Sequence, residues 1–332
     1  MKQWLARLFG AVSAPPPLGP LREPQALPVP AAPVNLPAPT RSERAPDLDL
    51  AFFLWLAGPH VRGAPSGAKL IQDELARLGR DPESAASLVP RVPAVIPQLL
   101  RSLRDEDSSA AALARQVAQD AVLVAEVIRE VNSPYYQPAT PVRSLEGALM
   151  LLGQNGLRML LARVAFRPII SFGAGALARE VAPRLWRQSE SCALAASLLA
   201  PHHGADPFEA YLAGLMHNVG LVVALRVIDA LVPAGALPDD DAFGLGLIRA
   251  SRQISARIAV QWELPAPIGH AIAHLGDDAP LPSVLARADR LAKLHLLAAS
   301  GQPAPVQAAA LLDGLERQVY EQLGEQQQEQ ES

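Results

Sequence analysis

Two histidines stand four residues apart in the last third of the chain, at positions 270 and 274. Residues at this spacing share one face of a helix, so His270 and His274 could hold a metal ion together with a third ligand. A metalloprotease helix would carry a glutamate directly after the first histidine, but the segment reads HAIAH. We therefore do not expect a metal on this pair.

Other catalytic patterns are weak or missing. Cys192 is the single cysteine and lies in an Ala/Leu-rich stretch, so we interpret it as a small buried hydrophobe. Gly173 and Gly175 lack the preceding strand and third glycine of a dinucleotide loop and predict a connector. The sequence has no Gly-x-Ser-x-Gly elbow. His202 and His203 follow Pro201, in a turn that we expect to be solvated.

The elements that position any site must be helices. The chain has 332 residues, half of them hydrophobic and only 5% aromatic, with Ala and Leu most frequent. This composition favours an all-α fold and allows a sizeable core. The formal net charge is −4, whereas a generic nucleic-acid binder carries a basic excess. A lone cysteine excludes an intramolecular disulfide and fits a cytoplasmic location.

The first 46 residues differ from the rest. Residues 2–12 place Trp4, Leu5, Leu8 and Phe9 on one helical face, which indicates either a weak membrane-surface contact or a frayed tail. Arg7 interrupts the apolar run, so this is a poor secretory signal. Residues 13–46 are rich in proline and predict an extended, disordered linker.

From residue 47 onward the pattern is helical, without strand periodicity or an internal repeat. Asp47, Ser144 and Asp206 are start signals, and Gly79, Gly153 and Gly220 are stop signals. A buried stripe is predicted at Leu113, Val117, Val124, Ile128 and Val131. The Gln/Glu-rich tail after Gly324 predicts disorder. The predicted helices cover residues 47–57, 68–78, 93–103, about 108–131, 144–152, 206–219, 246–261, 266–275 and 283–298.

A series of short motifs resembles the HDOD family, the HD-related output domains. Three pieces are the most specific: VNSPYY at residues 131–136, LWRQS at 185–189 and AGLMHNVG at 213–220. Their order and spacing make the signal strong. The remaining pieces are LVPRVP (88–93), QDAVL (119–123), SLEGALMLLG (144–153), WELP (262–265) and AD (288–289).

The resemblance implies a helical signalling domain related to metal-dependent HD phosphohydrolases but without their metal ligands. The positions that match the ligands of the hydrolases are Gln188, His217, Asn218 and Asp289. Two of the four are neutral amides, which are poor ligands for a transition metal. The remaining two donors are fewer than the three that a catalytic site needs. Ser251 and Leu275 replace further histidines of the enzymes.

The four positions also have ordinary structural interpretations. His217 lies in an Ala/Leu/Met helix and fits a core histidine. Asp289 precedes Lys293 by four residues, the spacing of a surface ion pair. We expect the four side chains to persist as a polar network that joins helices where a metal once did.

These observations predict a non-enzymatic bacterial signalling module that acts through protein–protein contacts with other signalling proteins. No catalytic residue, metal or cofactor is expected, and no nucleic-acid partner. The alternative is a divergent metal-dependent phosphohydrolase acting on nucleotides. The predicted organisation has four parts: the N-terminal segment and linker at 1–46, a helical extension at 47–87, the HDOD domain at 88–298, and a C-terminal helix with its tail at 299–332.

Overall fold

The computed structural model describes residues 47–58, 67–89, 115, 117–118, 120–133, 136, 138–171, 175–232 and 237–331, with side chains as far as 326. The predictions for residues 1–46, for the helix at 93–103, for Leu113 and for Gly173 lie outside these ranges. Residues Asp47–Ser332 form one compact unit, so the extension at 47–87 is continuous with the rest.

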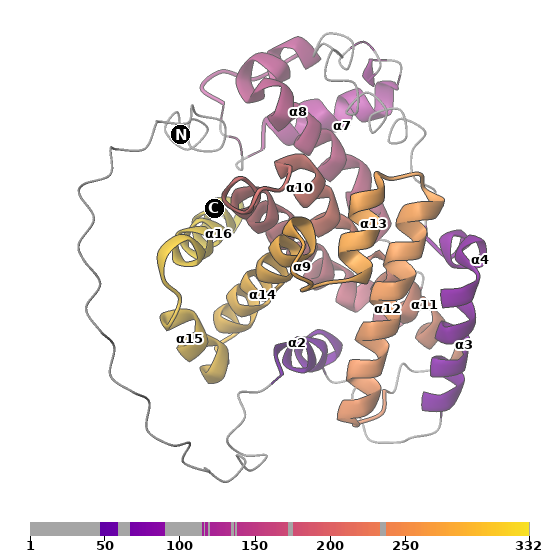
Figure 1. Cartoon of the computed structure of the whole chain (residues 1–332). Coiled ribbons are helices and arrows are strands. Elements are labelled where there is room, and N and C mark those ends of the chain that lie inside the picture. The colour runs from indigo at the N-terminus through magenta and orange to yellow at the C-terminus, as the bar shows by residue number, and fades with distance from the viewer. Residues whose placement is uncertain are drawn as a thin grey trace, which may run out of the picture. The chain divides into compact units, whose positions relative to one another are not determined.

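The fold is all-α, as the composition predicts: the described residues form helices and connecting turns, with no strand among them (Figure 1). The first helices are α2 (Leu48–Ala57), α3 (Ala68–Arg80), α4 (Pro82–Ser87), α7 (Ala121–Val131) and α8 (Leu145–Ile170). The central ones are α9 (Ala176–Leu199), the 3₁₀ turn η2 (Ala200–His203), α10 (Pro207–Met216) and α11 (Val219–Leu231). The last are α12 (Asp241–Gln261), α13 (Ala266–Ala273), α14 (Pro280–Ala299), α15 (Pro303–Ala310) and α16 (Gly314–Glu331).

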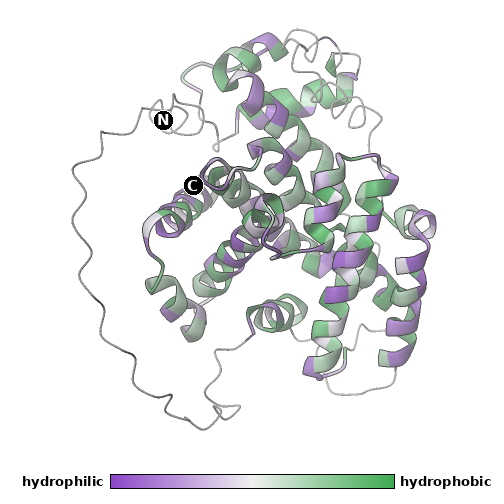
Figure 2. Ribbon diagram, in the orientation of Figure 1, coloured by the Kyte–Doolittle hydropathy of each residue, from purple (hydrophilic) through white to green (hydrophobic). Residues whose placement is uncertain are grey.

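Helix α9 is the centre of the core and packs most extensively on α10 and α14. The pairs α11–α12, α12–α13 and α7–α8 surround this trio (Figure 1). The stretch Pro207–Leu231 is long and apolar enough to span a membrane, but 94% of its apolar window is buried inside the protein. It is therefore part of the core of this unit, and the mostly green colour of α10 and α11 in Figure 2 shows that these helices are hydrophobic.

The helix starts follow the predicted capping chemistry. The carboxylate of Asp206 accepts the backbone N–H of Glu209, with Pro207 in the first turn. Ser144 caps α8 by accepting the N–H of Gly147, and Asp47 caps α2 by accepting that of Asp49. These bonds satisfy N–H groups that have no partner within the helix, which is why short polar residues mark the starts.

Several boundaries differ from the prediction. Gly79 lies inside α3, which continues to Arg80, and Asp81 then caps α4. Gly153, with φ of +71°, kinks α8, and the helix resumes as far as Ile170. Helix α7 begins only after Asp120. Val117 and Val131 of the predicted stripe are buried, whereas Val124 and Ile128 are only half-buried because α7 turns Leu123 and Val127 inward instead.

Two further predictions at helix ends were wrong. Helix α10 ends at Met216 and Gly220 lies within α11, so the predicted helix across residues 206–219 is broken at His217 and Asn218. Helix α16 continues through the Gln/Glu-rich residues to Glu331, although their composition predicts disorder.

The extension before residue 88 packs on the body of the unit. Phe52, Phe53 and Leu56 of α2 are buried, and α2 contacts α12 and α14. Helix α3 buries Ile71, Leu75 and Leu78 on one face and presents polar residues outward (Figure 2). Phe52 and Phe53 are thereby removed from solvent, and Trp55 is half-buried. The packing of α2 against α14 also brings the first turn of α2 close to Asp289.

Candidate functional site

The four positions singled out in the sequence lie together in the core. Gln188 comes from the middle of α9, His217 and Asn218 from the break between α10 and α11, and Asp289 from α14. All four side chains are buried. The break between α10 and α11 is what allows two consecutive residues to face the same cluster.

Amide groups link these residues directly. Nε2 of Gln188 donates to Oδ1 of Asp289 at 2.7 Å, and Nδ2 of Asn218 donates to Oε1 of Gln188. Asn218 also approaches Oγ of Ser189 at 3.2 Å. The two amides therefore form a chain of hydrogen bonds that joins the start of α11, through α9, to α14.

His217 belongs to the same cluster. Its Nδ1 donates to the carbonyl of Gly214 at 2.6 Å, since a carbonyl can only accept. Its Nε2 lies 3.3 Å from Oδ1 of Asp289. The backbone carbonyl of His217 accepts the hydroxyl of Ser255, which in turn accepts the N–H of Gly220. The histidine is thus fixed at its ring and at its backbone.

The glycines of the AGLMHNVG motif allow this packing. A Cβ at Gly214 would lie 2.4 Å from Cα of Ala193 on α9, and one at Gly220 would lie 1.9 Å from the carbonyl oxygen of Ser251 on α12. Both helix pairs approach too closely for any side chain. The two glycines of this motif are therefore needed for close helix packing, in addition to the polar residues that the motif contributes to the cluster.

Lys293 supplies a positive charge to this cluster, and the prediction of a surface ion pair was wrong. Lys293 is only 4% exposed and Asp289 is buried beside it. Nζ of Lys293 lies 2.5 Å from Oδ2 of Asp289. The helical spacing was correct, but this face of α14 points into the core.

Asp49 and Arg252 complete the charge cluster, and sequence reasoning missed both. Oδ1 of Asp49 lies 2.6 Å from Nζ of Lys293, and its Oδ2 lies 2.6 Å from Nη2 of Arg252. Arg252 also approaches Oδ2 of Asp289 at 3.6 Å. The ring of Phe52 lies 5.4 Å from Nζ of Lys293. Asp49 lies too far from Arg252 and Asp289 in the sequence for any local pattern to connect them, so the sequence offered no signal that they meet.

The electrostatics keep both partners of the central pair charged. Burial alone would raise the pKa of Asp289, but Lys293, His217 and Arg252 outweigh it and hold that pKa well below its usual range. Burial alone would lower the pKa of Lys293, but Asp289 and Asp49 outweigh it and raise that pKa. The network therefore contains full charges in addition to the neutral amides that the sequence predicts.

One group of side chains in the described part of the chain has the spacing of a metal site: Cys192, His217 and Asp289, whose ligand atoms lie within 4.8 Å of one another. The chemistry does not fit an ion. Burial, reinforced by Asp289, raises the pKa of the Cys192 thiol well above its ordinary value, whereas a metal needs the thiolate. Both oxygens of Asp289 already face Gln188 or Lys293, and the cations Lys293 and Arg252 would repel a divalent ion.

The other histidine candidates lie elsewhere. His270 and His274 are exposed on α13 and at its end, where their rings stack with centroids 4.3 Å apart. They belong to no group of three possible ligands within the described ranges. Cys192 is buried, as expected, and His202 is exposed in η2.

The described helices form an all-α, HD-like fold around a buried polar cluster in which Gln188, Asn218 and His217 surround Asp289 and Lys293 pairs with that carboxylate. The HDOD domain model matches residues 89–277, more than half of the chain, and the chain belongs to the HDOD family. The match begins within one residue of the predicted boundary at 88. It ends before α14, so Asp289 and Lys293 lie beyond it.

One curated protein is similar in sequence, and several solved structures share the fold. The chain is 24% identical over 214 residues to an uncharacterized protein of Treponema pallidum (strain Nichols), a match that covers 61% of this chain and 40% of the relative. An HDOD domain protein with unknown function from Geobacter sulfurreducens superposes with a TM-score of 0.53 at 24% identity, covering 74% of this chain and 95% of that one. A protein from Shewanella amazonensis SB2B, provisionally named a phosphohydrolase, gives a TM-score of 0.54 at 22% identity over 77% and 96% of the two chains.

Proposed function

We propose that this chain is a non-enzymatic signal-transduction module that works through contacts with other signalling proteins. The observation that carries the proposal is the ammonium of Lys293 on the carboxylate of Asp289. A hydrolase of the HD type uses this region to bind an ion that activates water. Here a covalently attached cation already neutralises the carboxylate. Among the described residues, this pairing takes away the carboxylate that an activating ion would need, which supports a role without hydrolysis.

Two features support a role in protein contacts. The resemblance of the motifs to the HDOD family implies a role in signal transduction. The sequence has no receiver, cyclase or kinase motif of its own, so a partner protein would have to supply such an activity. A solved relative from Marinobacter aquaeolei VT8, provisionally named a signal transduction protein, shares the fold with a TM-score of 0.54. We also propose a cytoplasmic location, which the single cysteine fits. We propose no nucleic-acid partner, because the net charge is −4.

A metal-dependent phosphohydrolase is the second candidate, and one observation favours it. Cys192, His217 and Asp289 place three possible ligand atoms close together. An ion there would have to displace Lys293 from Asp289 and deprotonate the thiol. The observed contacts therefore count against this candidate.

The two candidates differ in metal content and turnover. The full-length protein is expressed with added Mn²⁺, Fe²⁺ or Zn²⁺, its metal is measured by plasma mass spectrometry, and hydrolysis of bis(4-nitrophenyl) phosphate is followed. We expect less than a tenth of an equivalent of metal and the same residual rate in wild type and His217→Ala. One equivalent of metal, with metal and turnover both lost in His217→Ala, would refute the proposal.

Protein contacts are tested separately. Full-length protein and a version lacking residues 1–46 serve as baits in the same cytoplasmic extract, and bound proteins are identified by mass spectrometry. We expect a specific signalling protein to be retained by both baits, because the described helical unit begins at Asp47. Retention by neither bait would count against a contact module, and retention by the longer bait alone would place the contact in residues 1–46.

A further inference from the structure

Helix α2 lies on helices that are distant from it in the sequence. It packs on α12, α14 and α9, whereas α12 separates it from α3, the next described helix along the chain (Figure 1). The contacts that position α2 are therefore long-range ones. A helix held in this way resembles a helical peptide bound to the surface of another protein.

The side chains that α2 turns inward have the spacing of such a peptide. A helix that lies in an apolar groove anchors through positions i, i+3, i+4 and i+7, which in α2 are Asp49, Phe52, Phe53 and Leu56. The three apolar anchors are at most 3% exposed. Phe53 packs on Gly244 of α12, where a Cβ would come within 2.9 Å of the ring. The polar anchor contacts charged side chains of α12 and α14.

Asp49 is the counter-ion of two cations that belong to these helices. Its carboxylate contacts Lys293 and Arg252, each at 2.6 Å, and Asp47 before α2 also attracts Arg252. Without α2, the two cations would share only the carboxylate of Asp289, which leaves one positive charge without a partner. Such a charge is costly where water is excluded. The surface that α2 covers therefore favours a carboxylate supplied by another segment.

The contact of Asp49 lies at the edge of the cluster. The side chains of Asp49 and Arg252 are 27% and 21% exposed, whereas those of Lys293 and Asp289 are 5% exposed. Water and salt therefore weaken the outer ion pair more than the inner one. Asp49 can leave while Lys293 remains paired with Asp289.

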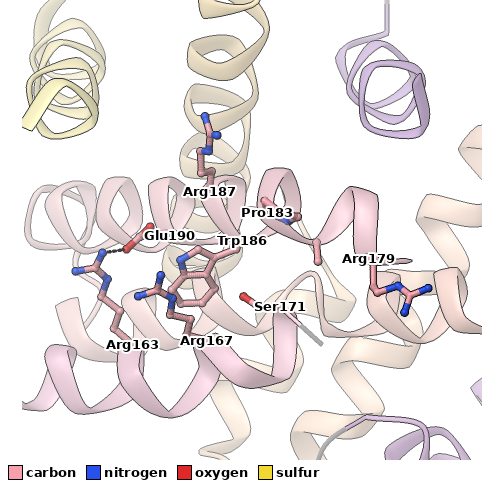
Figure 3. Close-up of a pocket in the computed structure, with 9 residues that line it drawn as sticks. Arg163, Arg167, Ser171, Arg179, Pro183, Trp186, Arg187 and Glu190 are labelled. Atoms are coloured by element: carbon pink, nitrogen blue, oxygen red, sulfur yellow. Dashed lines mark ion pairs between the residues drawn. The ribbon is translucent and has the colours of Figure 1, made fainter. Parts of the chain in front are cut away.

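The pocket of about 400 Å³ between α8 and α9 differs in this respect (Figure 3). Arg163 in its wall pairs with Glu190, as the dashed line in Figure 3 shows, and with Glu130. Arg167 approaches Glu130 at 3.5 Å. Carboxylates of α7 and α9 already face these arginines, so their charges favour no added ligand.

We propose that α2 occupies the docking site of a partner helix and keeps it closed until that helix displaces α2. The partner helix carries an acidic residue, two aromatic residues and a leucine at the i, i+3, i+4 and i+7 spacing. Its carboxylate replaces Asp49 between Lys293 and Arg252, and an aromatic ring packs on Gly244. This inference rests on the proposed function, because it names the kind of helix that a signalling partner would bring.

A fluorescein-labelled peptide of residues 45–60 is the probe, and its binding to the full-length protein is followed by fluorescence anisotropy. In wild type α2 covers the surface, so the peptide should bind weakly. Asp49→Lys in the protein places a cation against Lys293 and Arg252 and weakens the docking of α2. The peptide should then bind at least about tenfold more tightly. Asp73→Lys on α3 is the matched control, because Asp73 is exposed and the charge change is the same. It should bind the peptide as wild type does.

A second peptide with Asp49→Asn tests recognition of the carboxylate. It should bind the Asp49→Lys protein at least about tenfold more weakly than the native peptide, because a charged hydrogen bond is lost. Equal affinities of the two peptides would overturn the proposal. So would a folded Asp49→Lys protein that does not bind the native peptide.

Hydrogen exchange of the wild type needs no variant. The amides of α2 should exchange at least about a hundredfold faster than those of α9, because α2 opens separately from the core. If α2 exchanges as slowly as α9, or if circular dichroism shows that Asp49→Lys unfolds the whole chain, α2 is a fixed part of the core and the proposal is wrong.

A second copy of this chain would be a different occupant. Light scattering should give the same molecular mass for wild type and Asp49→Lys, whereas a wild-type dimer that dissociates in the variant would overturn the proposal. The peptide experiment involves neither metal nor turnover. Its failure is therefore distinguishable from failure of the proposed function, which metal-dependent turnover would reveal.

Discussion

Nζ of Lys293 lies 2.5 Å from Oδ2 of Asp289, one turn earlier on α14, and both side chains are buried. A second carboxylate, Asp49, reaches the same ammonium from α2 at 2.6 Å. This arrangement joins the first described helix to the centre of the domain through a charge cluster.

Lys293→Met should destabilise the fold by about 3–5 kcal/mol, because it leaves the buried Asp289 carboxylate without its main partner. Urea unfolding at pH 7 measures this loss. Adding Asp289→Asn in the same chain should recover part of the stability, since the unpaired charge is then removed. A loss below 1 kcal/mol in Lys293→Met would contradict the buried pair.

The free energy of unfolding should decrease at acidic pH, and protonation of Asp289 should account for part of this decrease. Its pKa is lowered in the folded state, so its contribution is complete above the ordinary carboxyl pKa of about 4 and is lost as the pH falls below it. Asp289→Asn should therefore show a shallower loss between about pH 5 and pH 2. Urea midpoints across this range provide the measurement, with the exposed Asp277→Asn as control. Equal slopes for wild type and Asp289→Asn would argue against this role.

Gln188→His combined with Asn218→Asp should not restore hydrolysis. Lys293 still neutralises Asp289 in that variant, and Ser251 and Leu275 remain in place of further histidines. Phosphodiesterase assays with Mn²⁺ or Fe²⁺ should give the same rate as wild type. Turnover that requires metal in the double variant would show that the charge cluster does not block an ion.

Gly220→Ala should destabilise the protein by about 3 kcal/mol or more, because its Cβ would lie 1.9 Å from the carbonyl oxygen of Ser251. Gly246→Ala is the matched control within α12. Its Cβ would approach no atom closer than 3.8 Å, and the helix should gain about 0.5–1 kcal/mol. Chemical denaturation of both variants compares them, and equal stabilities would contradict the close approach of α11 and α12.

The sequence by itself determined the all-α class, the capped starts at Ser144 and Asp206, the family, and the four positions that meet in the core. These depend on local rules, because helix periodicity, capping bonds and family motifs each involve residues within a few positions of one another. The His217–Asn218 dipeptide belongs to such a motif, which is why it could be placed at the site without a structure.

Only the tertiary structure decided what that site contains. Spacing alone placed Lys293 beside Asp289, but whether this face of α14 is buried depends on how α2 and α9 pack against it. Asp49 is 240 residues away from Asp289, and no local pattern joins them. Burial changes a surface ion pair into a fixed charge cluster because it removes the water that would otherwise screen it.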